Sequence, residues 1–206
     1  MDLETSKNMG GIGSLLIVIA CLGSFGSVYV GTLALVGLIL VLIALKGFAD
    51  FYKEAGIFNN ALYALIIAIV GGIVTVGVAI VSVMMWMTSL SGLDLNDPNS
   101  IILYFQTHFM DMSALWELLG IIVAIVITLF IFVVLTVVFF RKSLNLMFTK
   151  TGVGMFGTAG LLMLIGAVLT IVLVGLILIW VGFILLIVAF FSVKAQATPP
   201  PPQPPA

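Results

Sequence analysis

The single histidine of this 206-residue chain is the first candidate for chemistry. His108 lies one helical turn before Asp111, and this spacing could hold a metal ion if Asp94 or Asp97 added oxygen ligands. The alternative is a solvated histidine at the membrane interface. The stretch from residue 94 to 100 lacks the ligand spacing and the glycine of a calcium loop, so we predict no metal here.

The single cysteine is the second candidate. Cys21 follows Val-Ile-Ala, a loose match to a lipoprotein cleavage box, but residues 1–7 are net negative and suit a signal peptide badly. With one histidine and one cysteine, the chain has no Ser-His-Asp, Cys-His or cysteine-cluster zinc arrangement. We therefore expect no enzyme activity and no cofactor.

The composition points to a membrane protein. Hydrophobic residues make up 63% of the chain and charged residues 7%, whereas a soluble domain is about one-half apolar and one-quarter charged. An ordinary soluble domain and a disordered chain are both excluded. A net charge of −1 gives no electrostatic surface for nucleic acid, so the expected surroundings are the lipid bilayer.

Charge-free stretches locate the membrane segments. They cover residues 8–45, 61–87, 118–140 and 151–193, and the first and last are about twice the ~20 residues that one span needs. Each of these two should fold as a helical hairpin, broken near residues 23–27 and between Gly166 and Gly175. The sequence thus predicts an all-α, polytopic transmembrane helical bundle with six membrane segments. Their ranges are 9–26, 29–48, 58–87, 116–141, 155–171 and 174–194.

The basic residues predict the orientation. With six segments and a cytoplasmic N-terminus, all seven Lys and Arg residues lie on the cytoplasmic side, as the positive-inside rule requires. The expected cytoplasmic parts are residues 1–8, the loops 46–57 and 141–154, and the Pro-rich tail 195–206. The transmembrane domain is 9–194, with an outer loop at 88–116, in a multi-pass protein of the cell membrane. Charge alone leaves open whether the two hairpins span fully or are re-entrant.

The two long stretches resemble each other. Residues 36–44 align with 181–189, and residues 11–16 align with 157–162 after a one-residue shift. Short apolar segments also match by chance, so a true repeat and a coincidence both remain open. A true repeat would give two hairpins of like orientation, unlike the inverted repeats of many secondary transporters.

The charge-free stretches that form the predicted spans contain no proline either, and charged residues occur only near the span ends, which argues against active transport. Their small residues should mediate helix contacts, and their hydroxyls should bond to carbonyls of their own helix. The contacts could lie within the chain or between copies of a homo-oligomer. The packing candidates are Gly71, Gly72, Thr75 and Gly77 on the third segment and Gly157 and Gly160 on the fifth.

Each loop carries one further signal. In the outer loop, Asp97 and Pro98 predict a helix start, followed by apolar residues at helical spacing as far as Trp116. In the first cytoplasmic loop, Lys46, Asp50, Tyr52 and Lys53 form either an interfacial anchor, with Lys46–Asp50 and Asp50–Lys53 ion pairs, or a docking surface for a cytoplasmic partner. Gly56 should end this helix.

The tail prolines predict polyproline II, as a spacer or as a ligand for a proline-binding groove.

Three segments of the first third of the chain resemble a known family. They are residues 10–15 (Gly-Gly-Ile-Gly-Ser-Leu), residues 38–46 followed by Asp50, Tyr52 and Lys53, and residues 57–62 (Ile-Phe-Asn-Asn-Ala-Leu). Together they resemble the membrane family called domain of unknown function 996, which is mostly archaeal. The resemblance is specific over residues 9–65 and looser to about 193. It implies a multi-span membrane protein and brings no activity, substrate or catalytic residue.

Three functions are compatible with these observations. The favoured one is a non-enzymatic structural, scaffold or accessory subunit that contacts itself or another membrane subunit. The alternative is a passive channel or permease for a small or apolar solute, which would need a path along Ser24, Thr75 or Thr128. The third is an enzyme acting on lipid, with either the Asp50, Lys53 and Glu54 cluster or the His108–Asp111 pair as its reactive groups.

Overall fold

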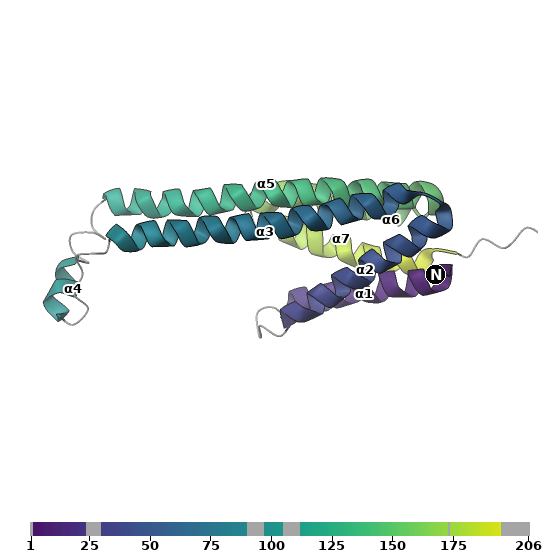
Figure 1. The fold of residues 1–206 in the computed structure, drawn as a ribbon, viewed down its shortest axis with the longest axis horizontal. Coiled ribbons are helices and arrows are strands. Elements are labelled where there is room, and N and C mark those ends of the chain that lie inside the picture. The colour runs from purple at the N-terminus through teal and green to yellow at the C-terminus, as the bar shows by residue number, and fades with distance from the viewer. Residues whose placement is uncertain (1, 24–29, 90–96, 105–111, 173, 195–206) are drawn as a thin grey trace, which may run out of the picture. The chain divides into compact units, whose positions relative to one another are not determined.

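The structure is a computed structural model that describes residues 2–23, 30–89, 97–104, 112–172 and 174–194 (Figure 1). These residues are helical apart from short turns and contain no strand. The elements are α1 (Leu3–Gly23), α2 (Val30–Tyr52), α3 (Ala55–Ser89), α4 (Pro98–Tyr104), α5 (Met112–Thr151), α6 (Gly154–Val168), the 3-10 turn η2 (Leu169–Val172) and α7 (Val174–Ser192).

Six of these helices are long and apolar enough to cross a membrane. This confirms the prediction of an all-helical protein with six membrane segments. Each long charge-free stretch divides into two helices, α1 with α2 and α6 with α7, and the two members pack against each other. The second break falls at η2, between Gly166 and Gly175 as expected. The first break follows Gly23, and most of the hinge expected at residues 23–27 lies outside the described residues.

The first helix begins six residues earlier than expected because Asp2 caps it. The backbone N–H of Thr5 donates to the Asp2 carboxylate at 3.0 Å, which satisfies one of the free N–H groups of the first turn. Hydrogen bonding from Thr5 also lowers the pKa of the Asp2 carboxyl below its ordinary value of 3.8. The cap therefore stabilises the folded state above that value and is lost as the pH falls through the lower folded pKa.

The helix start predicted in the outer loop is confirmed. α4 begins at Pro98, and the Asp97 carboxylate accepts a hydrogen bond from the backbone N–H of Asn99 at 3.0 Å. Of the apolar series expected to continue to Trp116, residues 105–111 lie outside the described part of the chain. This undescribed segment also includes His108 and Asp111.

The chain forms two compact units. Unit 1 consists of residues 1–63 and 137–206, and unit 2 consists of residues 64–136. Among the described residues, every buried hydrophobic side chain except that of Ala64 belongs to unit 1. The fully buried large side chains there are Phe48, Phe156, Phe190, Leu45, Ile57, Leu144, Met147, Met163 and Leu186.

Glycine allows α1 and α2 to pack backbone to backbone. A Cβ added at Gly37 would lie 2.6 Å from the carbonyl oxygen of Gly13 and 2.9 Å from the side chain of Ile17. Real Cβ contacts are essentially never this short. The glycines therefore set the distance between the two helices.

The α6–α7 pair has a looser contact at the corresponding positions. A Cβ added at Gly182 would meet the side chain of Met163 at 2.6 Å and the carbonyl oxygen of Ala159 at 3.5 Å. The sequence alignment pairs Ala159 with Gly13 and Gly182 with position 37, and Met163 directly follows its aligned segment as Ile17 does. The second helices bury corresponding positions as well: 37, 41, 44 and 45 in α2, and 182, 186, 189 and 190 in α7. The internal sequence similarity thus has a structural counterpart, because α1 with α2 and α6 with α7 pack through corresponding positions.

Two tight turns connect the helices of unit 1. After α2, Lys53 adopts a positive φ of 53°, and the N–H of Glu54 donates to the carbonyl of Ala49 at 2.9 Å. This is a Schellman-type helix end. The helix therefore ends before Gly56, the expected terminator, and Gly56 lies in the first turn of α3. After α5, Gly152 has a φ of 72° and its N–H donates to the carbonyl of Phe148 at 2.9 Å.

Removing glycine at position 152 and introducing it at position 53 should have opposite effects on the stability of the fold. Gly152→Ala adds a methyl group that meets nothing within 4 Å, so its expected cost of about 1 kcal/mol comes from the left-handed backbone alone. Lys53→Gly should stabilise by a similar amount, because it removes the same strain. Thermal unfolding of the purified variants in detergent measures both effects. Equal destabilisation by the two changes would contradict this assignment of backbone strain.

Unit 2 contains the rest of α3 and most of α5. At its best-packed point, Gly71 of α3 faces the ring of Phe132 of α5, where a Cβ would clash. Elsewhere both helices leave large apolar side chains exposed, including Ile73 at 68% and Ile127 at 52%. Such a surface is suited to lipid or to another membrane protein.

Candidate functional site

The basic residues gather at one end of unit 1. All seven Lys and Arg residues belong to this unit, as do four of the eight acidic ones, whereas residues 64–136 contain the other four acidic residues and no basic one. α1 and α7 are antiparallel, because Gly10 contacts Phe190 while the indole N–H of Trp180 donates to the carbonyl of Val18 at 3.3 Å. The start of α1 therefore lies beside the end of α7.

The end of α2 joins the same cluster. The rings of Phe48 and Phe190 stack with their centroids 5.9 Å apart, and the ring of Phe156, near the start of α6, meets Phe190 edge-on at 5.1 Å. Four helix ends thus converge around Phe190. We call this region, together with the turns at residues 52–55 and 151–154, the basic end.

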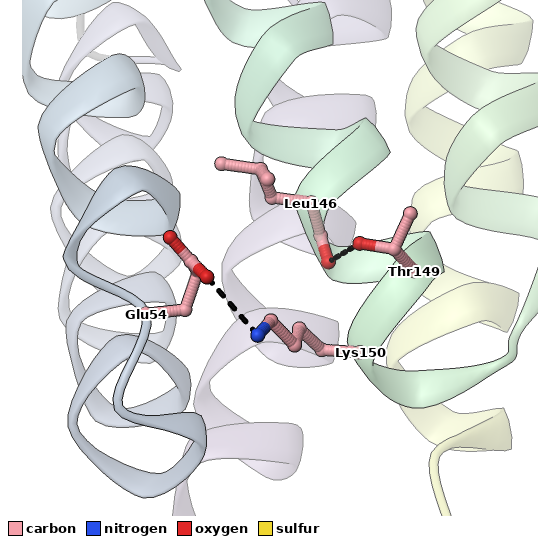
Figure 2. Close-up of polar contacts among 4 residues, drawn as sticks. All are labelled: Glu54, Leu146, Thr149 and Lys150. Atoms are coloured by element: carbon pink, nitrogen blue, oxygen red, sulfur yellow. Dashed lines mark hydrogen bonds and ion pairs between the residues drawn. The ribbon is translucent and has the colours of Figure 1, made fainter.

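The two turns of the basic end are tied together. The Lys150 ammonium lies 3.0 Å from the Glu54 carboxylate, and the Thr149 hydroxyl on the same turn donates to the carbonyl of Leu146 at 2.9 Å (Figure 2). About two turns before Lys150 along α5, the buried Ser143 hydroxyl donates to the carbonyl of Ile57 at 2.6 Å. These contacts fix the start of α3 against the end of α5.

Breaking the Glu54–Lys150 pair should have a small effect that depends on salt. Both side chains are about one-third exposed, at 32% and 38%, so we expect Glu54→Gln to cost at most about 1 kcal/mol. The loss should vanish near 1 M salt, where the Debye length is about 3 Å. The exchanged pair, Glu54→Lys with Lys150→Glu, should recover the stability in low salt. Melting temperatures at two salt concentrations test this, and a loss that persists in high salt would show that the pair is not the cause.

The predicted docking residues lie at this end but do not form the expected ion pairs. The described residues show no Lys46–Asp50 or Asp50–Lys53 contact within 4 Å. Lys46 instead reaches across to α3, where its ammonium lies 5.9 Å from the ring centroid of Phe58. Lys53 leaves the helical path because of its positive φ, so the three-residue helical spacing from Asp50 no longer holds. Tyr52 stacks on Phe48 at 6.4 Å, and Asp50 is exposed.

The predicted packing glycines separate into two groups. Gly71, Gly157 and Gly160 face neighbouring helices; a Cβ at Gly157 would lie 3.6 Å from Phe148, and one at Gly160 would lie 3.1 Å from Arg141. Among the described residues, a Cβ added at Gly72 or Gly77 would meet no neighbouring atom within 4 Å. The Thr75 hydroxyl donates to the carbonyl of Gly71 at 2.7 Å, which is the bond within the helix that we expected.

Sequence reasoning missed the contacts that organise the basic end. Ser143 and Ile57 are 86 residues apart in the sequence. Glu54 and Lys150 pair across two different turns, so no short sequence motif predicts their contact. Trp180 was missed too, although an indole within an apolar span needs a hydrogen-bond acceptor and this need was a usable signal.

The site offers little chemistry of its own. The described residues contain no group of three His, Cys, Asp or Glu side chains that could hold a metal ion. Cys21 is exposed, near the end of α1. The groups that remain at the basic end are cations, carboxylates and aromatic rings, which are suited to charged or amphipathic ligands.

Comparison with known proteins places this architecture in a family. The family model described as protein of unknown function (DUF996) matches residues 33–184. The chain belongs to this family. The match runs from α2 to α7, so the segment at residues 10–15, which carries part of the resemblance, lies before it.

A relative extends the similarity to nearly the whole chain. A protein named uncharacterized protein MJ1644, from the archaeon Methanocaldococcus jannaschii, is 33% identical over 195 residues, which cover 93% of each protein. No solved structure matches this chain.

Proposed function

We propose that this protein is a non-enzymatic membrane subunit that uses the helices of unit 2 to contact another membrane subunit. The observation that carries the proposal is the exposure of these helices. Only 17% of the most apolar stretch of α3 and 6% of that of α5 is buried, against 28–44% in the other four helices that could span a membrane. A large apolar surface is thus left for another membrane protein to cover.

The polar groups within the spans support a non-enzymatic role. The hydroxyls of Thr75, Thr128 and Thr170 each donate to the carbonyl four residues earlier, at 2.7 to 2.9 Å. Ser14 does the same to Gly10 at 2.8 Å. Each of these bonds uses the single proton of the hydroxyl, so none of these groups is available as a hydrogen-bond donor to a substrate, or to a solute that passes along Thr75 and Thr128.

The test is gentle extraction of the tagged full-length chain from its native membrane, followed by native mass spectrometry. The proposal expects a stoichiometric foreign subunit. It also expects loss of that subunit in Gly72→Leu with Gly77→Leu, because both positions face open space and the fold itself should tolerate the added bulk. Ile73→Leu, at a position 68% exposed, is the matched control and should retain the partner.

Other results would overturn the proposal. A monomer or homo-oligomer with no foreign subunit would contradict it, as would a foreign subunit that is retained equally by the double variant and the control. Solute flux in liposomes containing the purified protein alone would instead support the channel or permease.

We further propose that the basic end faces the cytoplasm of a multi-pass protein in the cell membrane. The support is the segregation of charge: all basic residues lie in unit 1, and α4 begins at an acidic cap in a region without basic residues.

Single cysteines test this orientation. In a Cys21→Ala background, Asp50→Cys should react with an impermeant thiol reagent only after the cells are lysed, whereas Asn99→Cys should react in intact cells. Both positions are exposed, so the side of the membrane decides the reaction. The reverse pattern would place the basic end outside.

A further inference from the structure

At the basic end, the charged residues furthest from the helix ends are all positive. Along α5, Arg141 and Lys142 come nine and eight residues before Lys150, which places them about 12–14 Å from Lys150 along the helix, away from the turn at its end. Along α2, Lys46 comes four residues before Asp50, a separation of about 6 Å. The acidic residues of unit 1 lie at the helix ends, at positions 2, 4, 50 and 54. Lys46, Arg141 and Lys142 therefore lie further from the helix ends than any acidic residue of unit 1. We call these three residues the inner cations.

Arg141 differs from the other two inner cations. Lys46 lies over Phe58, and the Lys142 ammonium lies 4.9 Å from the ring centroid of Phe139. The stem of Arg141 instead packs on α6, where its Cγ would lie 3.1 Å from a Cβ at Gly160. Its Nε is buried, and no group in the described part of the chain accepts a hydrogen bond from it.

The guanidinium in this position lacks, among the described residues, a hydrogen-bond acceptor for its Nε, and of the groups that could supply one only an anion would also balance its charge. Arginine remains protonated in proteins, and a buried N–H without an acceptor is destabilising. The planar guanidinium matches a phosphate, which it can bind through two parallel hydrogen bonds. Arg141 also directly follows the charge-free stretch that ends at Phe140. It therefore lies where an apolar span gives way to the headgroup layer of a bilayer.

We propose that Arg141 binds the phosphate of an anionic membrane lipid on the α5–α6 side of the basic end. Gly160 gives the arginine stem room to lie against α6, and the guanidinium extends from there to the headgroup. Lys142 adds positive charge but is directed to Phe139, so its contribution is general attraction and not a specific hydrogen bond. The proposal does not depend on the partner subunit or on which side of the membrane the basic end faces.

Lipid titration of the purified, delipidated full-length protein in detergent tests the proposal. The readout is the melting temperature as short-chain phosphatidylglycerol, phosphatidylcholine or inorganic phosphate is added. We expect a saturable stabilisation by phosphatidylglycerol and none by the other two. Arg141→Gln should weaken the apparent affinity about tenfold or more, which corresponds to about 1.4 kcal/mol. Lys142→Gln, which removes the adjacent charge, should change the affinity less than threefold.

Several results would overturn the proposal. Equal losses in the two variants would indicate diffuse charge attraction and no bound headgroup. An unchanged affinity in Arg141→Gln would exclude the site, and equal stabilisation by inorganic phosphate would point to a free anion. Should Arg141→Gln fail to fold, Arg141→Lys keeps the charge without the bidentate geometry. Native mass spectrometry should then show fewer retained phosphatidylglycerol molecules on Arg141→Lys than on Lys142→Gln, and equal numbers would count against the proposal.

Discussion

Replacing Gly37 with leucine is expected to separate α1 from α2 and to abolish the folded monomer. The crossing is made backbone to backbone, since even a methyl group at Gly37 would lie 2.6 Å from the carbonyl of Gly13. A carbonyl on a helix cannot swing away as a flexible side chain can. Overpacking a core typically costs about 1–3 kcal/mol, and a contact between rigid backbones should exceed that range. Size-exclusion chromatography and thermal unfolding in detergent measure the loss.

Gly72→Leu is the matched control for this experiment. It introduces the same side chain on a helix of the same apolar character, at a position with nothing within 4 Å. When each chain is purified without its partner subunit, we expect the control to elute and melt like the unchanged protein, and Gly37→Ala to melt between the control and Gly37→Leu. A well-folded Gly37→Leu variant would mean that the two helices do not cross at this glycine.

Truncating Phe190 to alanine should destabilise unit 1 by about 3–5 kcal/mol. The side chain is fully buried at the point where α1, α2, α6 and α7 meet, between the rings of Phe48 and Phe156 and against Gly10. Its removal leaves a cavity bounded by four helices and removes two aromatic contacts. The basic end depends on this cluster for its shape, so lipid stabilisation through Arg141 should weaken as well.

The adjacent Phe191 is the control, because it is 45% exposed and the same truncation there creates no enclosed cavity. Phe191→Ala should cost well under half as much as Phe190→Ala. Chemical or thermal unfolding in detergent gives both values. Equal costs at the two positions would contradict the assignment of Phe190 as the central packing residue.

The sequence by itself was sufficient to locate the membrane segments. A span is defined by the local absence of charge, so residues 8–45 and 151–193 could be recognised as too long for one helix each. The break after Gly23 and the cap at Asp97 are also local, because they depend on the conformational preferences of the residues at those positions. The segregation of basic residues from residues 64–136 follows from order along the chain alone.

The candidate site could be predicted only in outline. The docking segment at residues 46–53 does lie at the basic end, but the partner of Lys46 is Phe58 on the next helix and not Asp50 on its own. Likewise Gly71 packs on Phe132 while Gly72 beside it faces open space. Position along a helix does not reveal which neighbour will cover it, and these choices follow from how the helices turn toward one another.

The tertiary structure alone decided which face of each span is buried. In a soluble helix, polar residues mark the outer face, so the sequence reveals the core. In this protein lipid-facing and core-facing residues are equally apolar: on α7, Leu186 is fully buried while Ile177 is 62% exposed. The central role of Phe190 and the unpartnered Nε of Arg141 therefore could not be derived from residue type. Contacts between helices distant in the sequence determine both, because hydrophobicity cannot distinguish a neighbouring helix from lipid.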